Sequence, residues 1–491
     1  MRWSFVGLTS KIVAQTLTAI VLARLVGPEV YGLIGLTTVY AMLMSLLLTQ
    51  GMSLAIVRME HPTDRDFGTV NLASQSAAIA LGAATVVLAP TLARFFDAPE
   101  MRSVLYVLAI GLCLKALAIL PLARLMRSVE FQLIARAEVV SSGVGAVVGI
   151  AVAALGGGVW AYVVLVLVTD ALFFVLLWNH ERDMPWRGSW RSLIELYSFA
   201  LTVTATQLLG FAARNVDNLL IARFLGPTAL GFYAVSYRFM RMPITSLVMI
   251  VNRALYPLFS AYREDRRRLS RNFLVATSAM SLISWPLMVV VIVFAEEIVL
   301  TLFGSDWLGA VTPTQILAAA AIAQTLSSMM TPAMLATGHE RAQLYWTIAI
   351  TTTLTISFFF TAQHGINAVA AAYTVVTLLF LPWAVVLMGR AAYFTPLRYL
   401  RALIPSALVA ISVGVLGLLA KEVLGTWLEL GPLVTAVVGS TLAGALTAAW
   451  AAPLLRRQMS EELSLLQRVV RLRRSPSRDE QQQLPADANQ S

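Results

Sequence analysis

The sequence predicts an all-α polytopic membrane protein with about 14 transmembrane helices. Three properties of its 491 residues support this: 58% are hydrophobic, only 13% are charged, and the mean hydropathy is +0.76. Ordinary soluble proteins carry charges on about a quarter of their residues. The composition therefore excludes a soluble fold and favours one continuous bundle of membrane helices.

Fourteen apolar runs are long enough to be membrane spans, since a helix needs about 20 apolar residues to cross the hydrocarbon. Arg2 precedes the first run, Lys11 lies at its start, and no cleavage site of small residues comes after it, so we expect it to be retained. The expected helices cover residues 10–27, 31–53, 69–92, 102–121, 138–156, 159–178, 196–222, 229–251, 273–303, 309–337, 342–362, 366–388, 399–420 and 430–453.

Basic residues indicate the orientation of these helices. With a cytoplasmic N-terminus, 27 of the 36 lysines and arginines fall on the cytoplasmic side, five on the opposite side and four at membrane depth. This excess predicts a multi-pass membrane protein with both termini in the cytoplasm. The net charge of +10 is scattered between apolar runs, so we expect membrane lipids and no nucleic acid as partners. Topology alone explains the cluster from Arg263 to Arg271, although an anionic partner stays an alternative.

A short internal repeat organises the chain. Val21 to Gly32 reads VLARLVGPEVYG, and Leu220 to Gly231 reads LIARFLGPTALG, at an offset of 199 residues. Each copy ends one helix and begins the next through a Gly-Pro turn, and six crossings separate the copies, which predicts a parallel duplication of six-helix lobes. The expected parts are an N-terminal lobe (1–180), a cytoplasmic loop (181–195), a C-terminal lobe (196–390), two additional helices (391–455) and an amphipathic or disordered cytoplasmic tail (456–491).

Motifs in and around the second copy resemble a known family. Arg214 to Ile221 (RNVDNLLI) runs into Gly226-Pro227 and Leu230 to Tyr233 (LGFY). Other matching pieces are GVWA at Gly158, NRALYP at Asn252, AEE at Ala295, FGSDW at Phe303 and ATG at Ala336. Together they resemble the bacterial polysaccharide flippases, the Wzx-like family of the multidrug/oligosaccharidyl-lipid/polysaccharide exporter superfamily. The likeness covers about residues 2–390 and is greatest to the colanic-acid-exporter and teichuronic-acid type.

The resemblance implies both a function and a fold. The function is that of a flippase of the bacterial inner membrane, which moves an undecaprenyl-diphosphate-linked oligosaccharide from the cytoplasmic to the periplasmic leaflet for exopolysaccharide or lipopolysaccharide biosynthesis. The implied fold has two lobes around a central cavity that open alternately. Coupling to a proton or sodium gradient, and polysaccharide polymerase or co-polymerase partners, are implied in the same way.

The seventh expected helix carries the main candidates for substrate binding: Arg214, Asn215, Asp217 and Asn218. They lie near mid-membrane, where an ionisable side chain is costly and normally faces a cavity or a partner. Arg214 offers a bidentate cationic fork to a diphosphate or acidic sugar, with Asp217 holding it or exchanging a proton. The alternative is a purely structural pair, because residues three apart share a helix face. The repeat-equivalent residues of the first lobe carry no charge: Gln15, Thr16, Thr18 and Ala19. Of these, Gln15 is a further candidate for substrate binding.

Weaker candidates lie on other helices. Lys115 in the fourth helix either faces the cavity or snorkels to the surface. Asp170 in the sixth helix is a candidate for proton or ion coupling, with no partner evident from the sequence. Gln75 shares a polar face of the third helix with Asn71 and Ser74, which can bind a sugar or a neighbouring helix.

No motif predicts an enzyme, a cofactor or a metal site. The four histidines lack metal-ligand spacing, Gly156 to Gly158 lacks the strand and lysine of a nucleotide loop, and Cys113 is the single cysteine. An ATP-driven mechanism within this chain is therefore unsupported.

Two other functions stay open as alternatives. An ion-coupled multidrug efflux antiporter of the same superfamily would more naturally hold carboxylates than an arginine in its cavity. A membrane polymerase or glycosyltransferase would need large external loops, whereas the longest external loops here have about ten residues.

Overall fold

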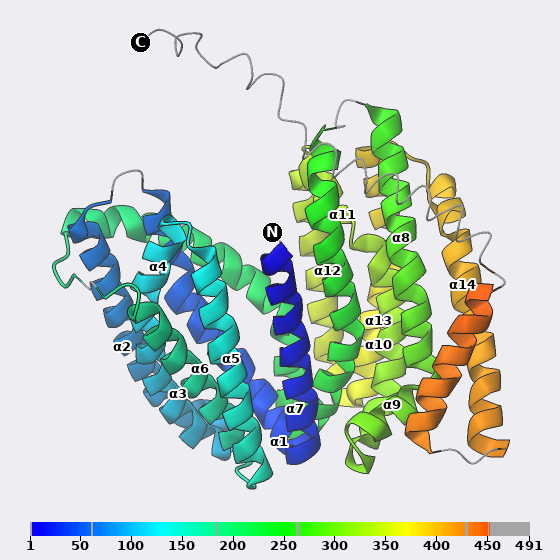
Figure 1. The fold of residues 1–491 in the computed structure, drawn as a ribbon, viewed down its shortest axis with the longest axis horizontal. Helices are drawn as coiled ribbons and strands as arrows, with labels where there is room; N and C mark the ends of the chain where they lie inside the picture. Colours follow the sequence, from blue (N-terminus) through cyan, green and yellow to red (C-terminus); the bar gives the residue numbers. More distant parts are fainter. Residues whose placement is uncertain are drawn as a thin grey trace, which may run out of the picture. The chain divides into compact units, whose positions relative to one another are not determined.

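The computed structural model describes residues 2–59, 62–182, 185–261, 265–427, 431–449 and 451. These residues form helices joined by turns and short loops, with no β-strand among them (Figure 1). In chain order the elements are α1 (Arg2–Arg58), α2 (Asp64–Phe95), α3 (Glu100–Leu117), α4 (Ile119–Arg127), α5 (Phe131–Ala154), α6 (Trp160–Trp178), α7 (Trp190–Ala261), α8 (Arg266–Val293), α9 (Ala295–Leu302), η1 (Ser305–Ala310), α10 (Val311–Ser327), α11 (Met330–Ala336), α12 (Glu340–Thr361), η2 (Ala362–His364), α13 (Ile366–Ala392), α14 (Pro396–Glu422), η3 (Val423–Trp427) and a last helix, Pro432–Ala449.

Twelve helical segments of the described residues are long and apolar enough to cross a membrane. Each of the fourteen expected runs overlaps one of them, because Ala14–Thr49 in α1 and Arg214–Arg241 in α7 each overlap two runs. The prediction of an all-helical polytopic membrane protein is confirmed. The fourth expected run, 102–121, proves longer than predicted, since α3 and α4 follow one another across Ala118 and together cover Glu100–Arg127.

The helices pack into two compact units. Unit 1 comprises the described residues of Met1–Val235, Leu302–Ala310 and Thr355–Val369, and unit 2 comprises those of Ser236–Thr301, Val311–Leu354 and Ala370–Ser491. The expected tail at 456–491 lies outside the described residues.

Two glycines break α1 and α7 in the same way. Gly27 has φ 76° and ψ 171°, and Gly226 has φ 81° and ψ 178°, a backbone conformation that is essentially restricted to glycine. Each glycine precedes a proline, whose fixed φ suits the first turn of the next helix. The two copies of the repeat therefore share one turn geometry, and Figure 1 shows α1, in dark blue, bending sharply at this turn.

The two turns also contact each other within unit 1. A Cβ atom on Gly32 would overlap the carbonyl oxygen of Pro227, and a Cβ atom on Gly231 would overlap that of Pro28. The contact is reciprocal, because the glycine of each copy meets the proline of the other. Only residues without a side chain allow this close backbone approach.

Small residues also set the packing of α5 against α6. Gly145 and Gly149, four residues apart on one face of α5, lie against Thr169 and Leu165 of α6, with no room for a Cβ atom at either glycine. Stripes of small residues allow membrane helices to approach closely. In unit 1, α6 also packs against α3, which brings Asp170 and Lys115 onto neighbouring helices.

In unit 2, α8 packs against both α10 and α14. Ser278 of α8 donates a hydrogen bond to the carbonyl of Ala402 (2.8 Å), and Ser406 of α14 donates one back to the carbonyl of Ser278 (3.2 Å). Phe394 stacks between Phe273 and Tyr399, with ring centroids 5.1 and 5.3 Å apart. The first additional helix is therefore an integral part of this unit.

Candidate functional site

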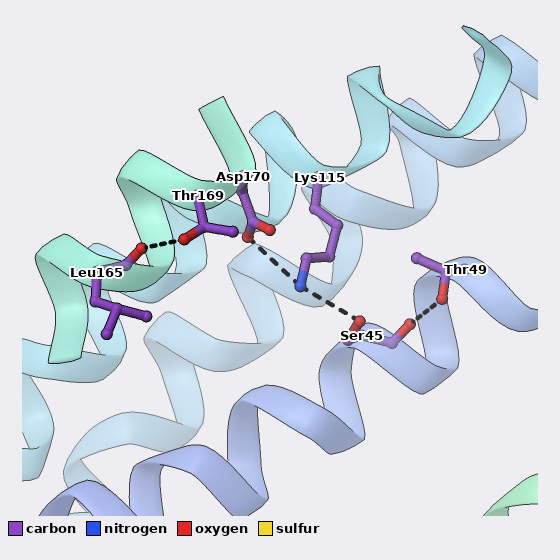
Figure 2. A network of polar contacts seen from close by, with 6 residues as sticks. All are labelled: Ser45, Thr49, Lys115, Leu165, Thr169 and Asp170. Atoms are coloured by element: carbon purple, nitrogen blue, oxygen red, sulfur yellow. Dashed lines mark hydrogen bonds and ion pairs between the residues drawn. The ribbon is translucent and has the colours of Figure 1, made fainter. Parts of the chain in front are cut away.

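An ion pair lies among the helices of unit 1. The ammonium Nζ of Lys115, in α3, is 3.4 Å from Oδ2 of Asp170, in α6. The two side chains are 28% and 17% exposed, so each is largely covered by protein. Figure 2 shows the two side chains extending toward each other from their separate helices. Two ionisable groups that meet inside a helical membrane bundle are the first candidates for a functional role.

The ammonium has a second partner on a third helix. Lys115 Nζ donates to Ser45 Oγ of α1 at 3.4 Å, so this side chain links α1, α3 and α6 (Figure 2). The surroundings are apolar and include Met44, Leu112 and Ala116. A charge in such surroundings is stable only when it is paired and hydrogen-bonded. Separating the two groups would leave two unpaired charges in apolar surroundings, and this free-energy cost stabilises the contact.

A cavity of about 20 Å³ adjoins the pair and has Lys115 and Asp170 in its wall. Its volume suffices for about one water molecule. Tyr40 and Thr85 are further polar residues of its lining, and the Tyr40 hydroxyl donates to Thr85 Oγ1 at 2.8 Å. The pair and the polar Tyr40–Thr85 contact thus line the same small cavity.

Lys115 and Asp170 are each other's partner. The sequence predicts that Lys115 either faces a cavity or snorkels to the surface, and it identifies no partner for Asp170. The structure gives each the other as its partner and places both beside a cavity. The signal available in the sequence was their similar depth, because Lys115 and Asp170 lie six and eight residues before the same-side ends of their expected spans.

The residues of the seventh expected helix have different surroundings. Asp217 is only 4% exposed, and its carboxylate accepts from the Tyr233 hydroxyl at 3.1 Å and from the backbone N–H of Asn218 at 2.8 Å. Tyr233 lies beyond the Gly226 turn, so this hydrogen bond joins the two halves of α7. The contact favours a structural role for Asp217.

The other residues predicted on this helix are more open. Arg214 is exposed, and its guanidinium lies over the backbone of Gly210. Asn218 is half-buried, and the half-buried Asn215 donates to the carbonyl of Phe211 at 2.8 Å, a contact within its own helix. An exposed arginine on an apolar helix remains available to an anionic ligand, so its substrate role stays a prediction.

The remaining candidates are dispersed. Gln15 is exposed on α1. On α2, Gln75 Nε2, Asn71 Oδ1 and Ser74 Oγ are buried without a hydrogen-bond partner, while Asn71 Nδ2 donates to the carbonyl of Pro185 at 3.2 Å. The expected polar face of this helix therefore exists, and part of it binds the segment that precedes α7.

Comparison with known proteins assigns the chain to a family. A family model described as a polysaccharide biosynthesis protein matches residues 21–312. The chain belongs to this polysaccharide biosynthesis family. The expected relationship to polysaccharide transporters is thereby confirmed, and the matched range includes both copies of the repeat, Lys115 and Asp170.

Individual relatives agree with this assignment. The chain is similar to the teichuronic acid biosynthesis protein TuaB of Bacillus subtilis, at 24% identity over 73% of this chain and 75% of the relative. It is also similar to the succinoglycan biosynthesis transport protein ExoT of Rhizobium meliloti, at 24% identity over 72% and 73%. Among solved structures, the lipid II flippase MurJ in an inward closed conformation has the same fold, with a TM-score of 0.73 at 12% identity over 93% of this chain and 100% of that one.

Proposed function

We propose that this protein flips an undecaprenyl-diphosphate-linked oligosaccharide from the cytoplasmic to the periplasmic leaflet of the bacterial inner membrane. The proposal rests on the agreement between the relatives found by sequence and the relative found by fold. The relatives by sequence are named for the biosynthesis of teichuronic acid and succinoglycan, and the shared fold is that of a flippase for a lipid-linked precursor. Two lobes, at 1–180 and 196–390, open alternately to either side of the membrane and so move the oligosaccharide headgroup of the lipid across. No covalent bond is made or broken in this process.

In this proposal the Lys115–Asp170 pair couples transport to a proton or sodium gradient. While the ammonium neutralises the carboxylate, the pair binds no ion. When α3 and α6 shift and the ammonium withdraws, the carboxylate is left without compensation in apolar surroundings and binds a proton or a sodium ion. Return of the ammonium then releases the bound ion. The 3.4 Å separation and the adjoining cavity support this role, because the pair is in contact and the cavity of about 20 Å³ beside it has the size of about one water molecule.

Arg214 is the proposed contact for the substrate diphosphate. Its guanidinium is exposed on an apolar helix and can form two parallel charge-assisted hydrogen bonds to phosphate oxygens. Both termini lie in the cytoplasm in this proposal, and a polysaccharide polymerase or co-polymerase takes up the flipped unit on the other side.

Deletion of the gene in its own host, with a plasmid copy as the control, tests the proposal. We expect surface polysaccharide to fall and the lipid-linked repeat unit to accumulate inside the cell, and the plasmid copy to restore both. Unchanged polysaccharide together with increased drug sensitivity would instead identify a multidrug efflux antiporter.

A further inference from the structure

A pocket of about 600 Å³ lies at one end of unit 1, away from the Lys115–Asp170 pair. The turn between α4 and α5, the first turns of α5 and the last turn of α6 form its wall. No residue of the proposed coupling site or of the seventh expected helix lines it. The pocket therefore needs an explanation of its own.

The pocket wall carries one full charge of each sign. Arg136 and Glu130 both line it, and within the described chain neither side chain has a partner. The neighbouring carboxylate of Glu181 is already engaged by Arg124 at 3.6 Å. His180 Nδ1 donates to the carbonyl of Leu176 at 3.1 Å, which leaves Nε2 available. These charges suit a ligand that itself carries both a negative and a positive group.

Apolar and aromatic side chains surround the charges. Leu133, Val140 and Leu176 complete the wall. Close by in the sequence, Phe131 is 55% exposed, and Trp178 is 42% exposed and stacks on Phe174 with ring centroids 6.0 Å apart. Exposed aromatic residues at the end of a membrane helix are typical of the headgroup level of the bilayer. The pocket therefore opens where lipid headgroups and the first part of their chains are found.

Val129 adds an independent sign of an apolar ligand. It has φ 62° and ends α4 in a turn in which the N–H of Glu130 donates to the carbonyl of Leu125 at 3.0 Å. Glycine is favoured at this position, and a β-branched residue there is strained. The Val129 side chain is nevertheless 68% exposed and lines the pocket. The turn therefore presents an exposed apolar side chain to the pocket at a position where glycine would be unstrained.

We propose that this pocket binds the headgroup of a zwitterionic phospholipid, with the lipid phosphate at Arg136 and its primary ammonium at Glu130. Val129 and the leucines then contact the glycerol and the first methylenes of the acyl chains. The site is a lipid-binding site of the membrane-embedded protein and does not depend on the proposed flippase activity.

Native mass spectrometry of the purified full chain in detergent tests the proposal, with phosphatidylethanolamine, phosphatidylglycerol and soluble phosphoethanolamine as probes. We expect phosphatidylethanolamine to bind most tightly, because it alone combines the phosphate, the ammonium and the acyl chains. Arg136→Gln should weaken its binding about tenfold, since a hydrogen bond to a charged group is lost. Glu130→Gln should abolish the preference over phosphatidylglycerol. Equal binding of both lipids by the wild type, or saturation by soluble phosphoethanolamine, would overturn the proposal.

Val129→Gly and two surface controls separate lipid binding from folding. Glycine relieves the strained turn, so the apparent Tm without lipid should rise while the affinity for phosphatidylethanolamine falls. Arg398→Gln and Glu340→Gln remove exposed charges outside the pocket and should leave lipid binding unchanged. If Val129→Gly left the affinity unchanged, or the controls weakened binding as much as Arg136→Gln, the pocket would not be the site.

Discussion

Replacement of Lys115 by methionine removes the ammonium but keeps a side chain of similar length. Asp170 then stays in the bundle as an uncompensated carboxylate, 17% exposed and beside an apolar cluster. Removing one partner of a buried ion pair costs about 3–5 kcal/mol. Because 28% and 17% of the two side chains are exposed, we expect the lower end, about 3 kcal/mol. Adding Asp170→Asn removes the stranded charge and should restore most of this stability.

The assay compares stability with transport for the same variants. Thermal unfolding of the purified proteins and their membrane abundance report stability, and polysaccharide export in the deletion strain reports transport. We expect Lys115→Met to lower both, and the double variant to regain stability but not export, because its site no longer carries charge. Full export by the double variant would show that the pair serves folding alone. An unchanged Tm for Lys115→Met would refute the buried-pair energetics.

Three further predictions concern the repeat and the seventh expected helix. Gly32→Ala places a Cβ atom on a backbone oxygen and should lower the stability by about 1–3 kcal/mol in thermal unfolding. Gly143→Ala, with open space at its Cβ, is the matched control, and equal effects of the two would contradict the turn contact. Tyr233→Phe deprives buried Asp217 of a donor and should cost about 1–3 kcal/mol, whereas an unchanged Tm would show that this hydrogen bond is dispensable. Arg214→Ala should abolish export at normal abundance and Arg214→Lys should retain part of it, so wild-type export by Arg214→Ala would exclude the diphosphate contact.

Much of the fold could be predicted because each membrane helix depends on the hydrophobicity and length of its own stretch of sequence. Apolar runs of sufficient length predict each span, and the Gly-Pro step in both copies of the repeat predicts the turns at Gly27 and Gly226. The reciprocal contact between these turns could not be predicted, since nothing in either copy specifies what packs against it. Only the absence of a side chain at Gly32 and Gly231 marks a close approach.

The candidate site was less accessible to sequence reasoning. The residues Lys115 and Asp170 stand out individually as ionisable groups in apolar runs, but their contact depends on how α3 and α6 pack, which a single sequence does not encode in its periodicity. A helix-face argument pointed Asp217 toward Arg214, three residues away. The structure shows Tyr233 hydrogen-bonded to it, from beyond a turn that carries the chain back past the same helix.

The most direct test of the flippase proposal uses the purified full chain in sealed liposomes. A fluorescent undecaprenyl-diphosphate-linked oligosaccharide is placed in both leaflets, and a membrane-impermeant glycosidase is added outside. We expect wild-type protein to make nearly all of the lipid-linked glycan cleavable, while Arg214→Ala protein leaves about half protected, as protein-free liposomes do. Protection of half of the glycan by folded wild-type protein, with or without a proton or sodium gradient, would refute the flippase proposal.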